Sequence, residues 1–262
     1  MPHASPVLSI MINAARKAGR ALARDFGEVE NLQVSKKGPS DFVTAADLRA
    51  EKILFEELSK ARPGYGFLME ERGAVEGSDK THRFIVDPLD GTTNFMHGLP
   101  HFAISIALER EGELAAGVIY DVAKDELFHA ERGAGAFLKD RRLRVAARTD
   151  LGGALIATGM PFRGKSGQER FLKELERVMA ATAGVRRFGS AALDLAYVAA
   201  GRFDAFWERD LAAWDIAAGA VIVREAGGFA REVDGGDFMK TGSIIAGNER
   251  MIALLGKTLA TV

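Results

Sequence analysis

The sequence contains no cysteine, and this absence excludes several classes of site. Disulfide bonds, thiolate zinc sites, iron–sulfur clusters and cysteine nucleophiles all require a thiol. Histidine is scarce as well, with 5 residues scattered over a chain of 262. A soft-metal site is therefore not expected, whereas the carboxylates of Asp and Glu suit a hard cation such as Mg²⁺.

An excess of one charge is also missing. Lys and Arg number 35 and Asp and Glu 36, which gives a formal net charge of -1. Such a balance offers no polyanion-binding surface, so a dedicated nucleic-acid role is disfavoured. No apolar run could span a membrane, and the first basic pair, Arg16 and Lys17, follows the apolar N-terminal residues, the reverse of a signal peptide. We therefore expect a cytoplasmic protein, and 47% hydrophobic residues indicate a globular one.

Two helices are predicted at the start of the chain. Apolar residues recur at helical spacing over residues 7–22 and again over about residues 45–61. Thr44 with Asp47 three residues later is a capping-box variant at the start of the second helix. The segment KKGPSD, residues 36–41, predicts a loop between them.

From Gly66 onward, short apolar runs alternate with turn residues. This texture predicts a meander of antiparallel strands, formed by GFLM, FIV, HFAISIALE, LAAGVIY, ELFHA, AFL and LRVA. Two leading helices on such a sheet make an α+β half. We expect this half to cover residues 1–148.

After Arg148 strands and helices alternate, which predicts an α/β half over residues 149–262. ALIATGM, FDAFWE and SIIAG are expected strands. Helices are expected over 168–183, from about Ala191, over 215–226 and at the end of the chain, the first with its inward residues at Phe171, Leu175, Val178 and Met179. No long linker separates the halves, so we expect them to pack tightly.

The segment VDPLDG combines two carboxylates with a chain reversal. Pro88 fixes its own φ and disfavours a helical Asp87, so the chain turns as it leaves the apolar run. Asp87 and Asp90 can then point into one mouth, and the Leu89 carbonyl is a further hard ligand. The five residues DPLDG could instead form only an exposed turn.

A phosphate cradle is predicted directly after these aspartates. Gly91 lets the backbone approach an anion closely. The amides of Gly91, Thr92 and Thr93 could then hold phosphate oxygens, as at a helix N-terminus.

Four segments occur along the chain in the order GPSDFVTAAD, MEERG, FIVDPLDGTTNF and WDIAAGAVIVREAGG. Together they resemble the inositol monophosphatase family of Mg²⁺-dependent, lithium-sensitive phosphatases, and RRFGSAALDLAYVAAGRFDAFWE is similar to its bacterial members. The resemblance covers nearly the whole chain. It implies alternating layers of helices and sheets, an αβαβα sandwich, with the site between the two halves.

The resemblance implies a ligand set for two Mg²⁺ ions. Glu70, Asp87 and the carbonyl of Leu89 would hold the first ion, and Asp87, Asp90 and Asp215 the second. Glu70 would also act in catalysis by serving a weaker third ion through water. From local sequence alone, Glu70 could equally be a solvated loop charge and Asp215 a helix N-cap.

The resemblance also implies how the attacking water is positioned. Asp47 would hydrogen-bond Thr92, and this pair would orient the water and take up its proton. Lys36 matches a family lysine near the site, although a solvated lysine fits equally well. His97 and His101 are interpreted as loop or core residues and not as ligands.

For the alcohol part of the substrate, the matching residues are Gly189, Ser190, Ala191 and Glu208. The first three could instead be small residues at a packed helix start, and Glu208 could pair with Arg209 on the surface. The expected substrate-binding set is completed by Asp90, Gly91, Thr92, Thr93 and Asp215.

The most concrete interpretation is hydrolysis of myo-inositol monophosphate, in a protein expected to be a homodimer. Histidinol phosphate, fructose 1,6-bisphosphate or a sugar phosphate are alternative substrates. An RNA- or transcription-associated binding protein of the same fold is an alternative of another class. Its only support in the chain is the basic clusters at 186–187 and 141–144, which solvated surfaces explain more simply.

Overall fold

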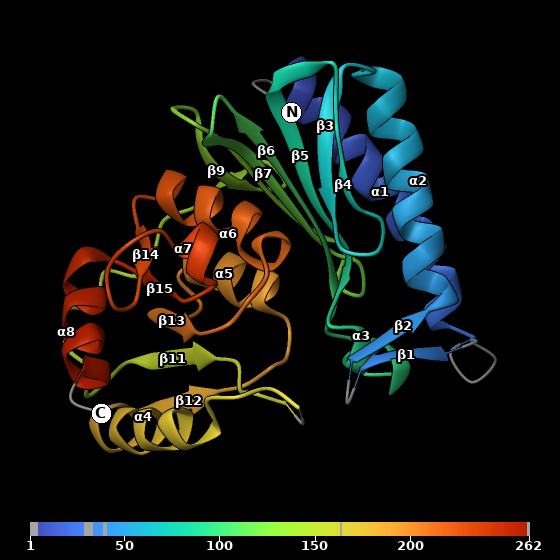
Figure 1. The fold of residues 1–262 in the computed structure, drawn as a ribbon. Coiled ribbons are helices and arrows are strands. Elements are labelled where there is room, and N and C mark those ends of the chain that lie inside the picture. Colours follow the sequence, from blue (N-terminus) through green and yellow to red (C-terminus); the bar gives the residue numbers. More distant parts are fainter. Residues whose placement is uncertain (1–4, 29–33, 39–40, 163, 261–262) are drawn as a thin grey trace.

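The computed structural model describes residues 5–28, 34–38, 41–162 and 164–260. Helices and sheets alternate in layers, as Figure 1 shows. Helices α1 and α2 cover one face of an eight-stranded sheet, α5 and α6 lie on its other face, and a five-stranded sheet with α4 and α8 outside it follows. The predicted αβαβα sandwich is confirmed.

The two leading helices form as their sequences predict. Helix α1, Pro6–Phe26, begins after Ser5, whose side chain accepts a hydrogen bond from the Leu8 N–H. Helix α2, Ala45–Ala61, begins with the predicted capping box of Thr44 and Asp47. Both helices bury one apolar stripe against the eight-stranded sheet.

The loop prediction for residues 36–41 is wrong for the part that the structure describes. Strands β1, Val34–Gly38, and β2, Asp41–Thr44, pair antiparallel there; residues 39–40 and the side chain of Lys36 lie outside the described part. Aromatic and β-branched residues such as Phe42 and Val43 favour strands, and the two strands satisfy each other's backbone groups.

The eight-stranded sheet has the order β10-β9-β8-β7-β6-β5-β3-β4. It is antiparallel except where β3 pairs parallel with β5. Its strands are β3 Tyr65–Met69, β4 Gly73–Val75, β5 Asp79–Asp90, β6 Ala103–Arg110, β7 Glu113–Asp121, β8 Glu126–Glu131, β9 Gly135–Leu138 and β10 Arg141–Arg142. The predicted meander is therefore present, but LRVA, residues 143–146, is not a strand: pairing with β9 stops at Arg142.

The five-stranded sheet has the order β12-β11-β13-β15-β14 and is mixed. Its strands are β11 Leu155–Thr158, β12 Gly184–Arg186, β13 Ala205–Glu208, β14 Phe229–Glu232 and β15 Ile244–Gly247. The helices around it are α4 Gln168–Ala181, α5 Ala191–Ala199, α6 Ala213–Glu225, α7 Phe238–Thr241 and α8 Glu249–Ala260.

One of the residues predicted on the inward face of α4 is exposed to solvent. Val178 is fully buried, whereas Met179 is 59% exposed. Successive helix residues differ by about 100° around the axis, so the neighbour of a buried residue can face solvent. No helix among the described residues combines the length and apolar character that a membrane crossing needs.

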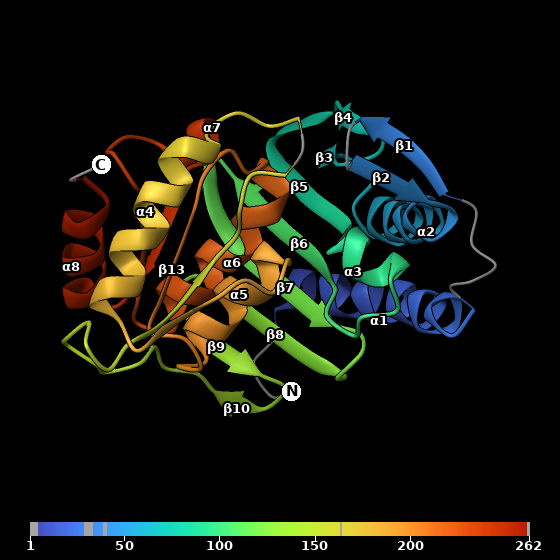
Figure 2. The same cartoon turned by 90° about the horizontal axis from the view of Figure 1, so that it is seen from below.

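The middle layer brings the two sheets together at the site. Helices α5 and α6 are rich in Ala and buried between the sheets, as seen from below in Figure 2. A Cβ on Gly117 of β7 would lie 2.5 Å from the Ala218 carbonyl oxygen, and one on Gly219 would lie 2.5 Å from Leu195. Small residues thus set the close spacing of this layer, and the first turns of α5 and α6 lie beside the end of β5.

Candidate metal and phosphate site

A register shift at the end of β5 turns two aspartates toward the same space. On β6, Asp87 pairs with Ser105 and Asp90 with Ala103, so the β5 segment contains one residue more than its partner. Such a bulge re-aims side chains, and Pro88 needs no ladder hydrogen bond inside it. The Leu89 N–H donates to Asp87 Oδ1 at 2.8 Å, which holds that carboxylate in place.

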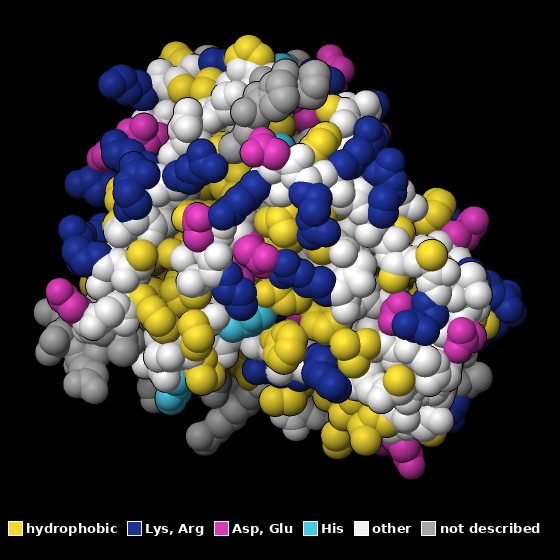
Figure 3. Space-filling view, turned by 180° about the vertical axis from the view of Figure 1, so that it is seen from behind, with side chains coloured by type: hydrophobic (Ala, Val, Ile, Leu, Met, Phe, Trp, Pro, Cys, Tyr) yellow, Lys and Arg dark blue, Asp and Glu magenta, His cyan; other side chains and the backbone are white. Residues whose placement is uncertain are grey.

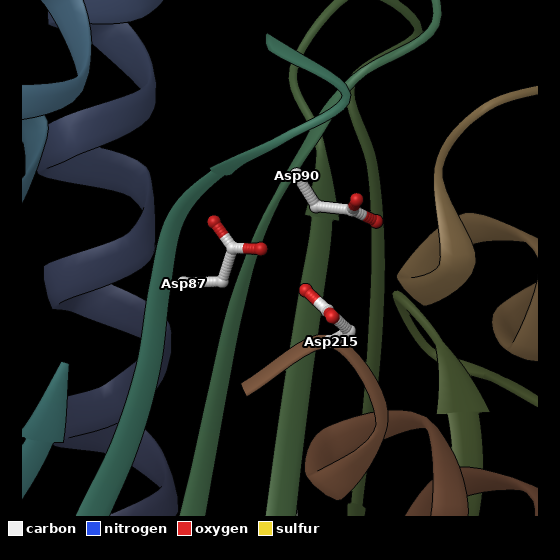
Figure 4. A group of neighbouring side chains, drawn as sticks. All are labelled: Asp87, Asp90 and Asp215. Carbon is white, nitrogen blue, oxygen red and sulfur yellow. The ribbon is translucent and has the colours of Figure 1, made fainter. Parts of the chain in front are cut away.

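A third aspartate comes from the first turn of α6. Asp215 accepts a hydrogen bond from the Ala212 N–H at 2.7 Å. Its carboxylate also faces Asp87 and Asp90, and one oxygen from each of the three lies within 4.8 Å of the others (Figure 4). Asp215 is therefore a cluster member that also accepts a hydrogen bond at the start of the helix, but the N-cap position itself is Ala212, so the interpretation of Asp215 as the N-cap is wrong.

The cluster is electrostatically unbalanced without a cation. Burial, followed by repulsion from Glu70 and the other two aspartates, raises the pKa of Asp87 well above its usual value. Burial raises the pKa of Asp90 to about 6, and burial with repulsion from Asp90 raises that of Asp215 to about 8. A bound cation would relieve this repulsion, and carboxylate oxygens are the donors that a hard divalent cation prefers.

Thr92 links this cluster to Asp47. Its Oγ1 lies 3.1 Å from Asp47 Oδ1 and 3.0 Å from the Leu89 carbonyl oxygen. Either oxygen can accept a hydrogen bond from the Thr92 hydroxyl. The other oxygen of Asp47 accepts from the Thr44 N–H at 2.9 Å. Asp47 thus caps α2 and contacts Thr92 at the same time. Burial raises its pKa, although the bonds from Thr44 oppose the shift.

Gly91 starts the short helix α3, Thr92–Met96, with φ of 92°. This left-handed conformation favours glycine, and a Cβ here would lie 3.0 Å from the His101 carbonyl oxygen. Asn94, which sequence reasoning missed, ties the loop down by donating from Nδ2 to the carbonyls of His101 and Phe188 at 2.8 Å each. An Asn directly after two threonines in a polar turn is the signal that could have found it, because its amide can bond to nearby carbonyls.

The segment expected at the alcohol holds Asp90. Ser190 Oγ donates to Asp90 Oδ2 at 2.6 Å, and the Ala192 N–H donates to the same oxygen at 2.7 Å. Ser190 is also the N-cap of α5, and Gly189 before it has φ of 83°. The small residues 189–191 therefore start a packed helix, and Ser190 together with the Ala192 N–H fixes one carboxylate of the cluster.

Glu208, at the end of β13, lines a cleft of about 680 Å³ that also contains Glu70, Asp90, residues 91–93 and Asp215. Burial, then repulsion from Asp215, raises the pKa of Glu208 to about 8. The alternative pair with Arg209 does not form. Arg209 instead donates from Nε to Glu174 at 2.9 Å and from Nη1 to Asp234 at 2.8 Å.

Sequence reasoning also missed Asp194, on α5. This side chain is buried, lines the same cleft, and its Oδ1 has no hydrogen-bond partner among the described residues. Burial, followed by repulsion from Glu208, raises its pKa well above the usual value. An acid inside the apolar helix run AALDLA is a visible signal, because a buried charge without a partner is costly.

Among the described residues, no histidine belongs to the group of potential metal ligands. His101 packs its ring against Phe188 at 5.1 Å and Tyr197 at 6.0 Å. Burial lowers its pKa to about 4, so the ring is neutral. His97 lines the mouth of the cleft near α3.

The sequence matches the model of the Inositol monophosphatase family over residues 3–261. The chain belongs to this family. It is 65% identical to an Inositol-1-monophosphatase of Mesorhizobium japonicum over 94% of this chain and 92% of that protein. Nus factor SuhB of Escherichia coli K12 is 45% identical over 94% of this chain and 93% of its own length.

The fold comparison agrees with the sequence comparison. The crystal structure of extragenic suppressor protein suhB from Bartonella henselae superimposes with a TM-score of 0.95 at 60% identity, covering 97% of this chain and 98% of that one. The family resemblance carried by the four sequence motifs is therefore confirmed.

Proposed function

We propose that the protein is a Mg²⁺-dependent phosphatase that hydrolyses myo-inositol monophosphate to inositol and phosphate. The observation that carries this proposal is the cluster of Asp87, Asp90 and Asp215, with oxygens within 4.8 Å of one another, beside the Thr92–Asp47 pair. Relatives named Inositol-1-monophosphatase, at up to 65% identity among those compared, support the substrate.

The residues that would hold Mg²⁺ are those of the cluster with two neighbours. Glu70, Asp87 and the Leu89 carbonyl would bind one ion, and Asp87, Asp90 and Asp215 a second, with Glu70 serving a weaker third. When bound, such ions supply positive charge for the phosphoryl oxygens and acidify the attacking water. The unpaired negative charge of the buried cluster supports this assignment.

Thr92 and Asp47 would handle the attacking water. A threonine hydroxyl that donates to Asp47 presents its lone pairs outward, so it can accept a hydrogen bond from water and orient it. Burial raises the pKa of Asp47, which makes this carboxylate a better proton acceptor than an exposed aspartate.

The phosphate would lie against α3, and the alcohol against β13. The first N–H groups of a helix have no partner within it, so those of Thr92 and Thr93 are available to phosphate oxygens, while the Gly91 N–H also lies within reach of the Asp90 carboxylate. Glu208 would accept hydrogen bonds from ring hydroxyls. Gly189, Ser190 and Ala191 would line this side, and Ser190 also holds Asp90 by a hydrogen bond. Histidinol phosphate, fructose 1,6-bisphosphate and sugar phosphates offer the same phosphate with other hydroxyl patterns.

A phosphate-release screen over a panel of monoesters with Mg²⁺ tests the proposal. We expect the highest kcat/KM on inositol monophosphate and no turnover in EDTA. Full activity in EDTA would contradict the metal assignment. A strong preference for another monoester would mean that this monoester, and not inositol monophosphate, is the substrate.

The naming of a relative as a Nus factor supports a second candidate, association with RNA or transcription proteins. Residues Arg141, Arg142, Arg186 and Arg187 are exposed. However, on the face seen in Figure 3, acidic and hydrophobic side chains lie among the Lys and Arg side chains. Salt-dependent RNA binding by the intact chain would support this candidate, and its absence at low salt would count against it.

We also infer a homodimer. Phe188 is 40% exposed and Leu99 53% exposed, and both belong to the loops that Asn94 ties together. Adjacent exposed apolar side chains favour association. Light scattering after size exclusion measures the mass, and a monomer at micromolar concentration would contradict the inference.

A further inference from the structure

Gly159 directly follows β11 and lies beside Glu208, the last residue of β13. Strands β11 and β13 are parallel, and Thr158 is paired with Trp207. The next residues along the two strands are Gly159 and Glu208. Neighbouring residues on adjacent strands are about 4.8 Å apart and project to the same face of the sheet. A side chain at position 159 would therefore share the space above the sheet with Glu208.

The Glu208 carboxyl group already fills that space. A Cβ built on Gly159 would overlap Cδ and both carboxylate oxygens of Glu208, all well inside 3.0 Å, a distance that real Cβ atoms essentially never go below. The backbone does not require glycine here, since Gly159 is not among the residues with positive φ. The glycine is needed for space alone.

The position of the Glu208 side chain is not fixed by hydrogen bonds to the described residues. No hydrogen bond joins its carboxyl group to another described residue, whereas Arg209, the next residue, is fixed by Glu174 and Asp234. Gly159 is itself buried and lines the same cleft. The open space at Gly159 therefore lets the Glu208 side chain lie over β11, where Arg187 and Lys165 attract its negative charge.

We propose that Gly159 is a positioning residue that sets selectivity for the alcohol, by letting the Glu208 carboxyl group lie across β11 and face the cleft. This inference rests on the proposed function, in which Glu208 contacts substrate hydroxyls. A methyl group at position 159 displaces the end of a flexible side chain and not backbone, so the fold accommodates it. The carboxyl group must turn away, and the aspartate cluster stays where it is.

The test uses Gly159→Ala in the full chain with Mg²⁺. We expect kcat/KM on inositol monophosphate to fall roughly ten- to a hundredfold, mainly through KM, as expected when a substrate hydroxyl loses its hydrogen-bond partner in a buried cleft. A flat aryl phosphate has no hydroxyls for Glu208, so its kcat/KM should fall much less. Gly152→Ala is the matched control, because Gly152 is exposed and a Cβ there meets only Asp150 Oδ1 at 3.7 Å.

A double-mutant cycle separates positioning from a merely structural role. If Gly159 acts through Glu208, Gly159→Ala should add nothing in a Glu208→Ala background, where the methyl group has room. Additive losses, or equal losses on both substrates, would overturn the proposal.

A crystal structure of Gly159→Ala distinguishes this proposal from the proposed function. A displaced Glu208 carboxyl group supports the positioning role, and an unmoved one overturns it, whichever monoester the wild type prefers. If the wild type does not hydrolyse inositol monophosphate, the proposed function fails by itself, and the selectivity comparison is then made with the monoester that the screen identifies.

Discussion

The two sides of the cleft hold their carboxyl groups in different ways. On the phosphate side each aspartate accepts a backbone N–H: Asp87 from Leu89, Asp90 from Ala192 and Asp215 from Ala212. On the alcohol side no described group hydrogen-bonds Glu208, and Oδ1 of Asp194 has no partner. The phosphate side is thus fixed by the backbone, whereas the alcohol side depends on packing.

This difference suggests a division of labour. Every phosphate monoester needs the same metal and water geometry, so rigid backbone anchoring suits the phosphate side. Selectivity among alcohols needs only one or two side chains, which can vary without disturbing the cluster. The predictions below test this division, from the largest expected effect to the smallest.

The largest effect is expected from Asp90→Asn. The substitution keeps the shape and one acceptor for Ser190 and the Ala192 N–H but removes a charge from the cluster. We expect kcat to fall by at least about a hundredfold on every substrate, since groups this close to the reacting phosphate act on the common step. Steady-state kinetics on inositol monophosphate and an aryl phosphate measure it, and near-normal Mg²⁺-dependent turnover would end the two-metal assignment.

A selective loss is expected from Glu208→Ala. Leaving a buried polar group without its hydrogen-bond partner costs about 1–3 kcal/mol, so kcat/KM on inositol monophosphate should fall roughly ten- to a hundredfold. An aryl phosphate should lose much less, because both substrates share the cluster, Thr92 and Asp47. Equal losses would mean that Glu208 supports the cluster or the fold.

The free energy of unfolding should depend on pH differently in the metal-free and in the Mg²⁺-bound protein. The pKa of Asp215 is raised from 3.8 to about 8. Between these values the folded metal-free protein keeps a proton that the unfolded chain has lost, so its free energy of unfolding falls as the pH rises. We expect the Tm in EDTA to fall over this interval.

Mg²⁺ should reverse most of this fall, because the cation replaces the proton and binds only the folded state. Thermal unfolding in EDTA and in Mg²⁺ across the same pH series measures both effects. Asp215→Asn should make the fall in EDTA shallower, and the other buried acids with raised pKa values, such as Asp90 and Glu208, account for what remains. A Tm in EDTA that rises with pH, or no response to Mg²⁺, would contradict an uncompensated carboxylate cluster.

The smallest effect is expected from Asp194→Asn. Burial raises the pKa of Asp194 well above its usual value and so favours the protonated acid, which an amide of the same shape resembles. We expect a change in the free energy of unfolding within about 1 kcal/mol and little change in aryl phosphate turnover. A collapse of stability would mean that Asp194 is ionised and paired.

The local sequence determined the first two helices and the kinds of side chain that are offered to a metal. Helical spacing and a capping box act within one or two turns, so α1 and α2 were predicted with their starts. The motif VDPLDGTTNF carries its own turn chemistry, because proline, glycine and the following hydroxyls constrain only their neighbours. The predictions of an inward Met179 and of a strand at LRVA were wrong. The side of a helix that is buried, and the residue at which strand pairing ends, depend on which other segments pack there.

Only the tertiary structure decided which of these groups meet. Asp90 and Ser190 are 100 residues apart and hydrogen-bond at 2.6 Å, and Asp215 joins Asp87 through the packing of α6 on the eight-stranded sheet. The role of Gly159 exists only because β11 and β13 are neighbours in parallel register. Contacts between distant segments arise from burial of shared apolar surface, which no local pattern encodes.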